Sequence, residues 1–240
     1  MIGTIAFAAA GITEESYPLP DKVRIGAFSQ SPPSEALPTD WEPLTFPNID
    51  RHTRYFLTRY QGDVVVQAKS HAAASGIIRK LRLNPREHAW LTWRWKIEHV
   101  LDKGDLRIKQ GDDYAARIYV TFEFEPQQAS LWERMAHAVA STSAGRKLPG
   151  TTLTYIWANR APQGTIADNP YSDQVKMIAL QSGNAKANQW IVEKRNIAED
   201  YRRAFGREPP PVMGIAIMTD TDNTGESATA YYGDIILSKK

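Results

Sequence analysis

The stretch "GDDYAARIYVTFEF", residues 111–124, decides the fold class of this chain. From Ala116 onward, apolar side chains fall on every second residue, which is the repeat of a β-strand with one face buried. The apolar positions are Ala116, Ile118, Val120, Phe122 and Phe124, and Arg117, Tyr119, Thr121 and Glu123 alternate with them. The stretch therefore predicts a strand with one apolar and one polar face.

A second run with the same repeat is "WLTWRWKIE", residues 90–98. It places Leu91, Trp93, Trp95 and Ile97 on an apolar face, and Thr92, Arg94, Lys96 and Glu98 on a polar one. If the two strands pair, Arg94, Lys96, Arg117 and Tyr119 share one polar face. Further strand-like runs occupy residues 53–60, 63–70, 151–159, 173–180, 189–195, 211–220 and 227–238, and Gln61-Gly62 reads as a hairpin turn.

Two segments have helical rather than strand-like patterns. "SLWERMAHAVAS", residues 130–141, has capping-box spacing at its start, which predicts a helix. "NIAEDYRRAFG", residues 196–206, offers Asn196 as N-cap and Gly206 as C-cap. Both are expected to be short insertions between strands. In the second, Ile197, Tyr201 and Phe205 lie on one stripe that is expected to pack against the sheets.

These elements predict an all-β fold: a two-sheet antiparallel β-sandwich of jelly-roll type with two short helical insertions. A chain of 240 residues suits a single sandwich domain, expected over residues 51–240. Residues 17–50 carry seven prolines and predict an extended arm. Residues 1–16 are interpreted as a remnant of a signal peptide, because an apolar run reaches Ala8-Ala9-Ala10 without a basic stretch before it. A periplasmic or secreted location is therefore predicted.

Composition excludes several classes of function. The chain has no cysteine, which removes disulfides, thiolate zinc sites and a cysteine nucleophile. Its 29 basic and 27 acidic residues alternate, so no nucleic-acid partner is expected. No segment has the ~20 consecutive apolar residues of a transmembrane helix. The five histidines lack metal-ligand spacing, and P-loop, dinucleotide and GxSxG motifs are missing from the sequence.

Five strings together resemble the bacterial domain-of-unknown-function family 3047 (DUF3047). They are "WRW" at 93–95, "GDDYAARIYVTF" at 111–122, "LTYIWAN" at 153–159, "EKRNIAEDYRRAFG" at 193–206 and "TDTDNTGESATAYYGDI" at 219–235. The resemblance extends from about Trp41 to the end of the chain. It implies an exported, sandwich-type protein and brings no assigned activity.

Charged residues gather where the strand of residues 115–124 begins. Asp112 and Asp113 directly precede it, Arg117 lies on its polar face, and Arg94 is expected across from it. One hypothesis is a salt-bridged loop that braces the sandwich. The other is the edge of a cleft, where these groups hydrogen-bond a sugar while Tyr119 or Trp157 stacks on its ring. In either case Asp112 or Asp113 should contact Arg117 or Arg94.

Two further sites are weaker candidates. A carboxylate pair can hydrolyse a glycosidic bond, and Asp112 with Glu193 is the pair we would choose. The loop of residues 220–226 partly resembles a calcium loop through Asp220 and Asp222, but Thr224 and Tyr231 replace the later ligands, so a simple turn is favoured.

The sequence thus favours an exported protein that binds a carbohydrate or another cell-envelope polymer without catalysis. A polysaccharide hydrolase or lyase on the same scaffold is the first alternative, and a structural subunit of an envelope assembly is the second. No cofactor is predicted beyond the calcium candidate. The oligomeric state is left open.

Overall fold

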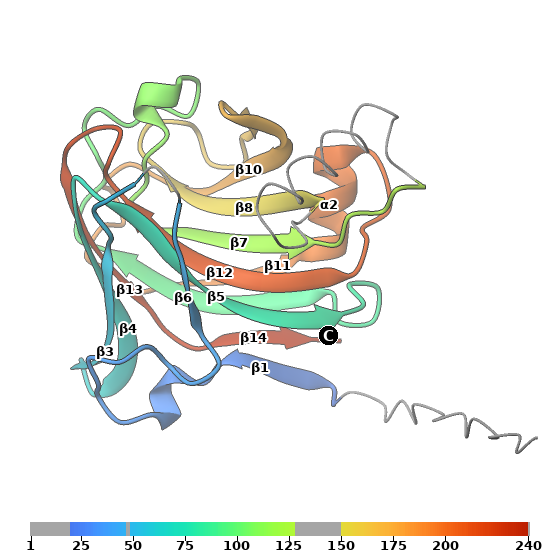
Figure 1. The fold of residues 1–240 in the computed structure, drawn as a ribbon, viewed down its shortest axis with the longest axis horizontal. Coiled ribbons are helices and arrows are strands. Elements are labelled where there is room, and N and C mark those ends of the chain that lie inside the picture. Colours follow the sequence, from blue (N-terminus) through green and yellow to red (C-terminus); the bar gives the residue numbers. More distant parts are fainter. Residues whose placement is uncertain (1–19, 47–48, 128–149, 240) are drawn as a thin grey trace, which may run out of the picture.

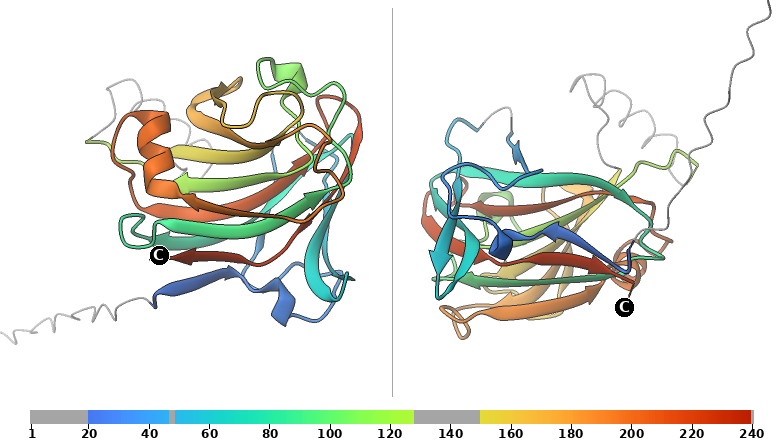
Figure 2. Two further views of the ribbon diagram at one scale, coloured as in Figure 1. Left: turned by 180° about the vertical axis from the view of Figure 1, so that it is seen from behind. Right: turned by 90° about the horizontal axis from the view of Figure 1, so that it is seen from below.

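A computed structural model describes residues 20–46, 49–127 and 150–239. In these ranges the chain folds into two seven-stranded sheets that face each other, with one α-helix at one end (Figure 1). The views from behind and below show the same two layers (Figure 2). The predicted all-β, two-sheet sandwich is confirmed.

Sheet A has the order β1-β14-β6-β13-β4-β3, with β11 also paired to β6, and all its pairs are antiparallel. Its strands are β1 (Lys22–Gly26), β3 (Arg54–Tyr60), β4 (Asp63–His71), β6 (Trp90–Ile97), β11 (Ile191–Asn196), β13 (Ser227–Tyr232) and β14 (Ile235–Ser238). The β3–β4 hairpin turns at Gln61 and Gly62, both with positive φ, as its two-residue loop requires.

Sheet B has the order β2-β5-β12-β7-β8-β10-β9. Its strands are β2 (Glu42–Leu44), β5 (Ala74–Leu83), β7 (Arg117–Phe122), β8 (Thr151–Ala158), β9 (Ile166–Asn169), β10 (Ser172–Ser182) and β12 (Val212–Asp220). The prediction of purely antiparallel sheets is wrong at one place, since β8 and β10 are parallel. The cause is topological: after β8 the chain forms β9 at the sheet edge and turns back, so β10 enters between them in the direction of β8.

The core lies between the sheets and is rich in aromatic rings. Trp93 packs on Tyr155 with ring centroids 5.3 Å apart, and Trp95 packs on Trp157 at 5.9 Å. All four side chains are buried, so the predicted alternation along residues 90–98 is confirmed. Trp157, a candidate for sugar stacking, is fully enclosed here, because its face of β8 points at sheet A and not at solvent.

The expected pairing of the two alternating strands is wrong. Strand β6 belongs to sheet A and β7 to sheet B. Their apolar faces meet in the core, which leaves Arg94 and Arg117 on opposite outer faces of the sandwich. Alternation along a strand identifies which residues share a face, but it does not identify the neighbouring strand.

The helix α2 (Ile197–Phe205) confirms the second helical prediction. Asn196 Oδ1 accepts hydrogen bonds from the backbone N–H groups of Ala198 and Glu199, both at 3.1 Å. Gly206 ends the helix with a φ of 69°, a left-handed conformation that glycine adopts without strain. The other predicted helix, residues 130–141, lies outside the described residues.

The arm predicted for residues 17–50 is more regular than expected. It contains β1, a 3-10 turn at Phe28–Gln30 and β2, and it buries Phe28 against Trp41 with ring centroids 5.4 Å apart. Strand β2 is an edge strand, where Pro43 removes no ladder hydrogen bond that the sheet needs. The predicted remnant of a signal peptide, residues 1–16, is outside the described ranges. Across those ranges, no helix has the length and apolar character to cross a bilayer.

Candidate functional site

A cleft of about 1090 Å³ runs over the outer face of sheet B. Its floor consists of outward side chains from the central strands, namely Ile78, Tyr119, Thr121, Thr152, Ala216 and Met218. The strand repeat explains this set, because the alternate residues of β7 and β8 point into the core. Among the described residues, the cleft floor is therefore the face of sheet B that points away from sheet A.

Two aromatic rings stand at opposite rims of the cleft. Phe46 follows β2 at one edge of sheet B, and Tyr171 lies in the β9–β10 turn at the other. Phe46 is 38% exposed and Tyr171 is 56% exposed. Among the described residues, these two aromatic side chains are the most exposed. Rings at the two rims can contact the two faces or ends of a bound molecule.

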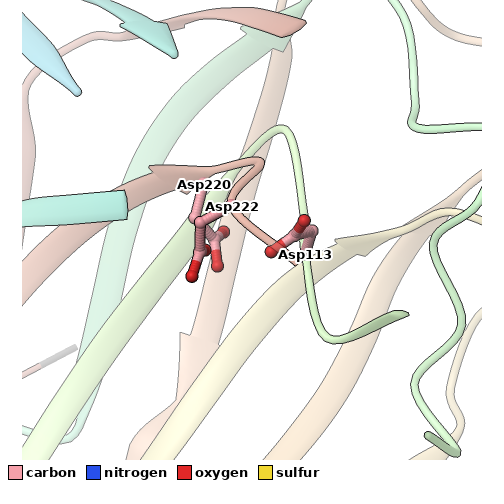
Figure 3. Close-up of side chains that lie close together, drawn as sticks. All are labelled: Asp113, Asp220 and Asp222. Atoms are coloured by element: carbon pink, nitrogen blue, oxygen red, sulfur yellow. The ribbon is translucent and has the colours of Figure 1, made fainter. Parts of the chain in front are cut away.

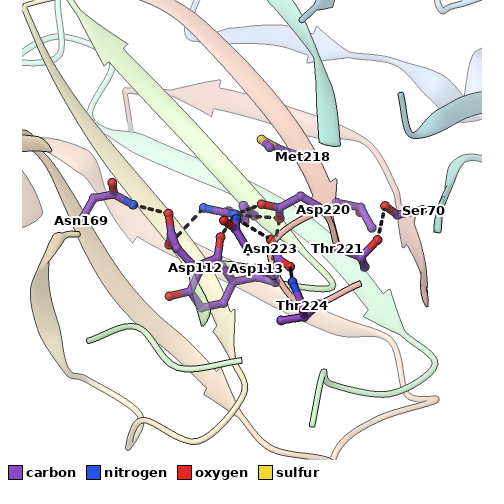
Figure 4. A network of polar contacts seen from close by, with 12 residues as sticks. Ser70, Asp112, Asp113, Asn169, Met218, Asp220, Thr221, Asn223 and Thr224 are labelled. Carbon is purple, nitrogen blue, oxygen red and sulfur yellow. Dashed lines mark hydrogen bonds and ion pairs between the residues drawn. The ribbon is translucent and has the colours of Figure 1, made fainter. Parts of the chain in front are cut away.

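One end of the cleft is built around the buried guanidinium of Arg117. Figure 4 shows the polar contacts of Asp112, Asp113 and Asp220 at this end. The Nε of Arg117 donates to Asp220 Oδ1 at 2.9 Å, and its Nη2 donates to Asp220 Oδ2 and, at 2.7 Å, to the carbonyl of Asp112. Its Nη1 lies 3.5 Å from Asp112 Oδ1. The predicted contact between Asp112 and Arg117 is therefore confirmed, with Asp220 as a partner that sequence reasoning did not assign.

Asp113 holds the loop that follows β12. Its Oδ2 accepts a hydrogen bond from the Thr224 backbone N–H at 2.7 Å, and its Oδ1 accepts one from Asn223 Nδ2 at 3.0 Å. The carboxylate is fully buried and does not line the cleft. Asp113 thus braces the loop through hydrogen bonds and not through the salt bridge that the salt-bridged-loop hypothesis expected.

Asp112 differs from its neighbour because it does line the cleft. Its Oδ2 accepts a hydrogen bond from Asn169 Nδ2 at 2.7 Å. Asn169 ends β9, so a residue from the sheet edge orients this carboxylate toward the cleft end. The sequence offered no sign of this contact, because a lone asparagine at a turn is ordinary turn chemistry.

Tyr119 lies where the strand pattern predicts, on the cleft floor beside Met218. The other predicted site residues lie elsewhere. Arg94 is on the outer face of sheet A, where its Nη2 lies 2.6 Å from Asp63 Oδ2. Glu193 is on β11 and accepts a hydrogen bond from Gln181 Nε2 at 2.7 Å, away from the cleft lining. The proposed pairing of Asp112 with Glu193 in one active site is not supported by this placement.

The carboxylates of Asp113, Asp220 and Asp222 gather at the same end, with one oxygen of each within 4.8 Å of the others (Figure 3). Oxygen ligands of this kind suit calcium. Asp220, however, already binds Arg117 through both carboxylate oxygens. Calcium binding by Asp220 and Asp222 stays a prediction, and Asp113 joins the candidate ligands from a segment far away in the sequence.

The pKa of Asp222 is raised above its ordinary value, chiefly by partial burial and then by the negative charge of Asp113. A raised native pKa means that folding favours the protonated form. Its contribution to stability is therefore full below the unfolded-state pKa of about 3.9 and is lost as the pH rises through the native value. At neutral pH the ionised Asp222 destabilises the native state.

Replacing Asp222 with Asn should therefore raise the melting temperature at neutral pH and leave it nearly unchanged near pH ~3. Thermal unfolding followed by circular dichroism across this range tests the expectation. The control is Asp50→Asn, an exposed aspartate whose replacement should change neither end of the range. A lower melting temperature for Asp222→Asn at neutral pH would show that the ionised carboxylate is stabilised in the native state, contrary to this prediction.

The structure has been compared with solved structures. The family 30 carbohydrate-binding module of the cellulosomal cellulase Cel9D-Cel44B of Clostridium thermocellum is similar with 11% identity and a TM-score of 0.39, over 90% of this chain and 96% of that one. The cellulose-induced protein Cip1 is similar with 8% identity and a TM-score of 0.39, over 84% and 92%. Likeness of this degree assigns no function.

No curated protein matches the sequence. A family model described as "Protein of unknown function (DUF3047)" matches residues 39–236, which run from β2 into β14 and include the cleft and the Arg117 cluster. The chain therefore belongs to the DUF3047 family.

Proposed function

We propose that this protein binds a carbohydrate chain, or another polymer of the cell envelope, in the cleft of sheet B without altering it chemically. The observation that carries the proposal is the cleft itself, which combines exposed rings at both rims with a polar end. Sugars present apolar C–H faces that stack on aromatic rings, and hydroxyl groups that hydrogen-bond to carboxylates and amides. Tyr171, Tyr119, Asp112 and Asn169 offer both kinds of contact.

Export to the periplasm or the medium belongs to the same proposal. The apolar run that ends at Ala8-Ala9-Ala10 supports it. In that location the cleft would meet polysaccharides of the envelope. Fractionation of cells that express the full chain, with detection of the protein in periplasm, medium and cytosol, tests this part separately from binding.

A polysaccharide hydrolase or lyase is the second candidate, and one observation favours it. Asp112, Asp220 and Asp222 all line the cleft, and the pKa of Asp222 is raised by burial and by Asp113. Carboxyl groups with pKa values pushed apart are what acid–base catalysis on sugars requires. Against it, Arg117 and Asn169 already bind two of the three carboxylates. Incubation of any bound glycan with the protein, followed by product analysis, separates binding from cleavage.

A glycan array of envelope and plant polysaccharides, probed with the purified full chain, tests the proposal directly. A ligand in the cleft should be displaced or weakened by changes at the rims. Replacing Tyr171 with Ala should weaken binding of the best array ligand about tenfold, which corresponds to loss of an aromatic anchor. Because Tyr171 is 56% exposed, its loss should leave the melting temperature nearly unchanged.

Two control variants separate the ring from other effects. Tyr171→Phe keeps the ring and removes the hydroxyl, which lies 2.8 Å from Asn223 Oδ1, so it should retain most of the affinity. Val192→Ala truncates an apolar side chain on sheet A that is 67% exposed, and it should have no effect. Unchanged affinity in Tyr171→Ala would place the ligand outside the cleft.

A further inference from the structure

The Arg117 end of the cleft holds more negative than positive charge. Asp112, Asp113 and Asp220 are 5%, 0% and 1% exposed, and the single buried guanidinium near them is that of Arg117, 3% exposed. The half-buried Asp222 adds a fourth carboxyl group beside Asp113. Buried charge without a counter-charge is costly, so this end of the cleft favours a positively charged ligand group.

Arg117 has no capacity left for an acidic ligand. Its Nε and Nη2 donate to Asp220 and to the Asp112 carbonyl, and Nη1 faces Asp112 Oδ1. Its guanidinium carbon also lies 4.5 Å from the centre of the Tyr114 ring. The other cation that lines the cleft, Lys80, pairs with Glu42 at 2.5 Å. A sugar carboxylate or sulfate would therefore find no unengaged cation among the described residues that line the cleft.

One buried acceptor at this end has an ion-pair partner but no hydrogen-bond donor in the described part of the chain. Asp112 Oδ1 is shielded from solvent and has no hydrogen-bond donor among the described residues. The nearest cationic nitrogen, Arg117 Nη1, is 3.5 Å away, beyond the ~2.7–3.2 Å range of an N–H···O bond. Asn169 holds the other oxygen, so the carboxylate is already oriented. A buried carboxylate oxygen without a donor has lost its hydrogen bonds to water, which costs free energy. A donor on the ligand would restore one of these hydrogen bonds.

A protonated amine fits both the excess negative charge and the acceptor without a donor, because it supplies positive charge and N–H donors in one group. We propose, as a refinement that rests on glycan binding in this cleft, that the Asp112 end selects a sugar with a free protonated amine, such as a residue of a de-N-acetylated amino-sugar polymer. Neutral sugars would bind more weakly there, and acidic sugars most weakly. Asp112 is then a specificity-determining residue.

The field of the carboxylates extends toward the rim, where the ammonium of Lys109 lies 5.2 Å from the centre of the Tyr171 ring. The pKa of Tyr171 is raised by burial first and then by Asp112, Asp222 and Asp113, so their field reaches the aromatic ring at the edge. A metal ion fits less well than an amine. Asp113 already accepts a hydrogen bond at each oxygen, and both oxygens of Asp220 bind Arg117. Asp112 is not part of the carboxylate triplet.

The test is a titration of the full chain with four oligosaccharides of equal length and β-1,4 linkage, followed by calorimetry at mildly acidic pH. The sugars are oligomers of glucosamine, N-acetylglucosamine, glucose and glucuronic acid. We expect the glucosamine oligomer to bind about 10- to 100-fold more tightly than its acetylated counterpart, as for one buried charge-assisted hydrogen bond. The preference should shrink at high salt.

Asp112→Asn connects the preference to the carboxylate. The amide keeps an oxygen for Asn169 but turns an N–H₂ donor toward the ligand amine, so the preference should fall to about the level of the neutral sugars. The glucose oligomer serves as the reference, and its affinity should fall by a smaller factor than that of the glucosamine oligomer. Folding is expected to persist, because the substitution removes one of the excess negative charges. The matched control is Asp63→Asn, the same change on the outer face of sheet A.

The outcomes separate this inference from the proposed function. If the neutral and acidic oligomers bind as tightly as the glucosamine oligomer, the amine preference is overturned while glycan binding stands. If Asp112→Asn keeps the full preference, Asp112 is not its source. If calcium chloride alone binds and displaces the glucosamine oligomer, the cluster is a metal site and the inference fails. If no oligosaccharide binds and the glycan array is also empty, glycan binding itself fails.

Discussion

Replacing Arg117 with Ala should lower the free energy of unfolding by about 3 to 5 kcal/mol, the usual cost of removing one partner of a buried ionic group. The guanidinium is 3% exposed and contacts both Asp220 and Asp112. Its removal leaves their carboxylates buried together with that of Asp113 and without a cation. The structure therefore identifies Arg117 as a brace, and any loss of ligand binding should accompany a loss of stability.

Urea unfolding near neutral pH measures the effect. The control is Arg94→Ala, which removes an arginine from the outer face of sheet A, where its side chain is 31% exposed and pairs with Asp63. We expect that variant to lose less than about 1 kcal/mol. An unchanged melting temperature in Arg117→Ala, with binding abolished, would make the cluster functional and not structural.

Replacing Tyr201 with Ala should cost about 3 to 5 kcal/mol, because a fully enclosed ring leaves a cavity that the core cannot refill. Tyr201 is 0% exposed and lies with its ring centroid 4.6 Å from that of Phe122 on β7. Its hydroxyl also hydrogen-bonds Thr151 Oγ1 at 3.0 Å. The side chain thus fastens α2 to both β7 and β8.

Phe205→Ala is the matched comparison on the same stripe of α2. The sequence predicts that all three residues of the stripe pack against the sandwich, but Phe205 is only partly buried and stacks on Tyr201 at 4.5 Å. Its loss should therefore cost less, about 1 to 2 kcal/mol by the area removed from water. Chemical denaturation of both variants tests the order. A larger loss for Phe205→Ala would mean that the end of α2 is more deeply packed than this structure shows.

Local patterns were predictable because local physical chemistry sets them. The period-two alternation of residues 90–98 and 115–124 assigns each side chain to a strand face, and Trp93 and Trp95 are buried as it predicts. Asn196 and Gly206 cap α2 through interactions that span only a few residues. Contact of Asp112 with Arg117 also follows from short separation, since the two lie on a loop and the strand it enters.

Contacts between distant segments determine the strand pairing, which the sequence did not predict. The partners of β7 are β12 and β8 and not β6, so Arg94 and Arg117 lie on opposite faces. Trp157 faces the core. The segment of residues 17–50 gains strands only because β14 and β5 have edges to pair with.

The sequence by itself determined the class of fold, the faces of its strands and the caps of α2, because these depend on side-chain period and on groups a few residues apart. Only the tertiary structure determined which residues form the cleft. Its polar end joins Asp112 to Asp220 and Asn169, and its rims place Phe46 opposite Tyr171. Strand order brings these residues together, and strand order depends on the packing of whole sheets, which no spacing along one chain encodes.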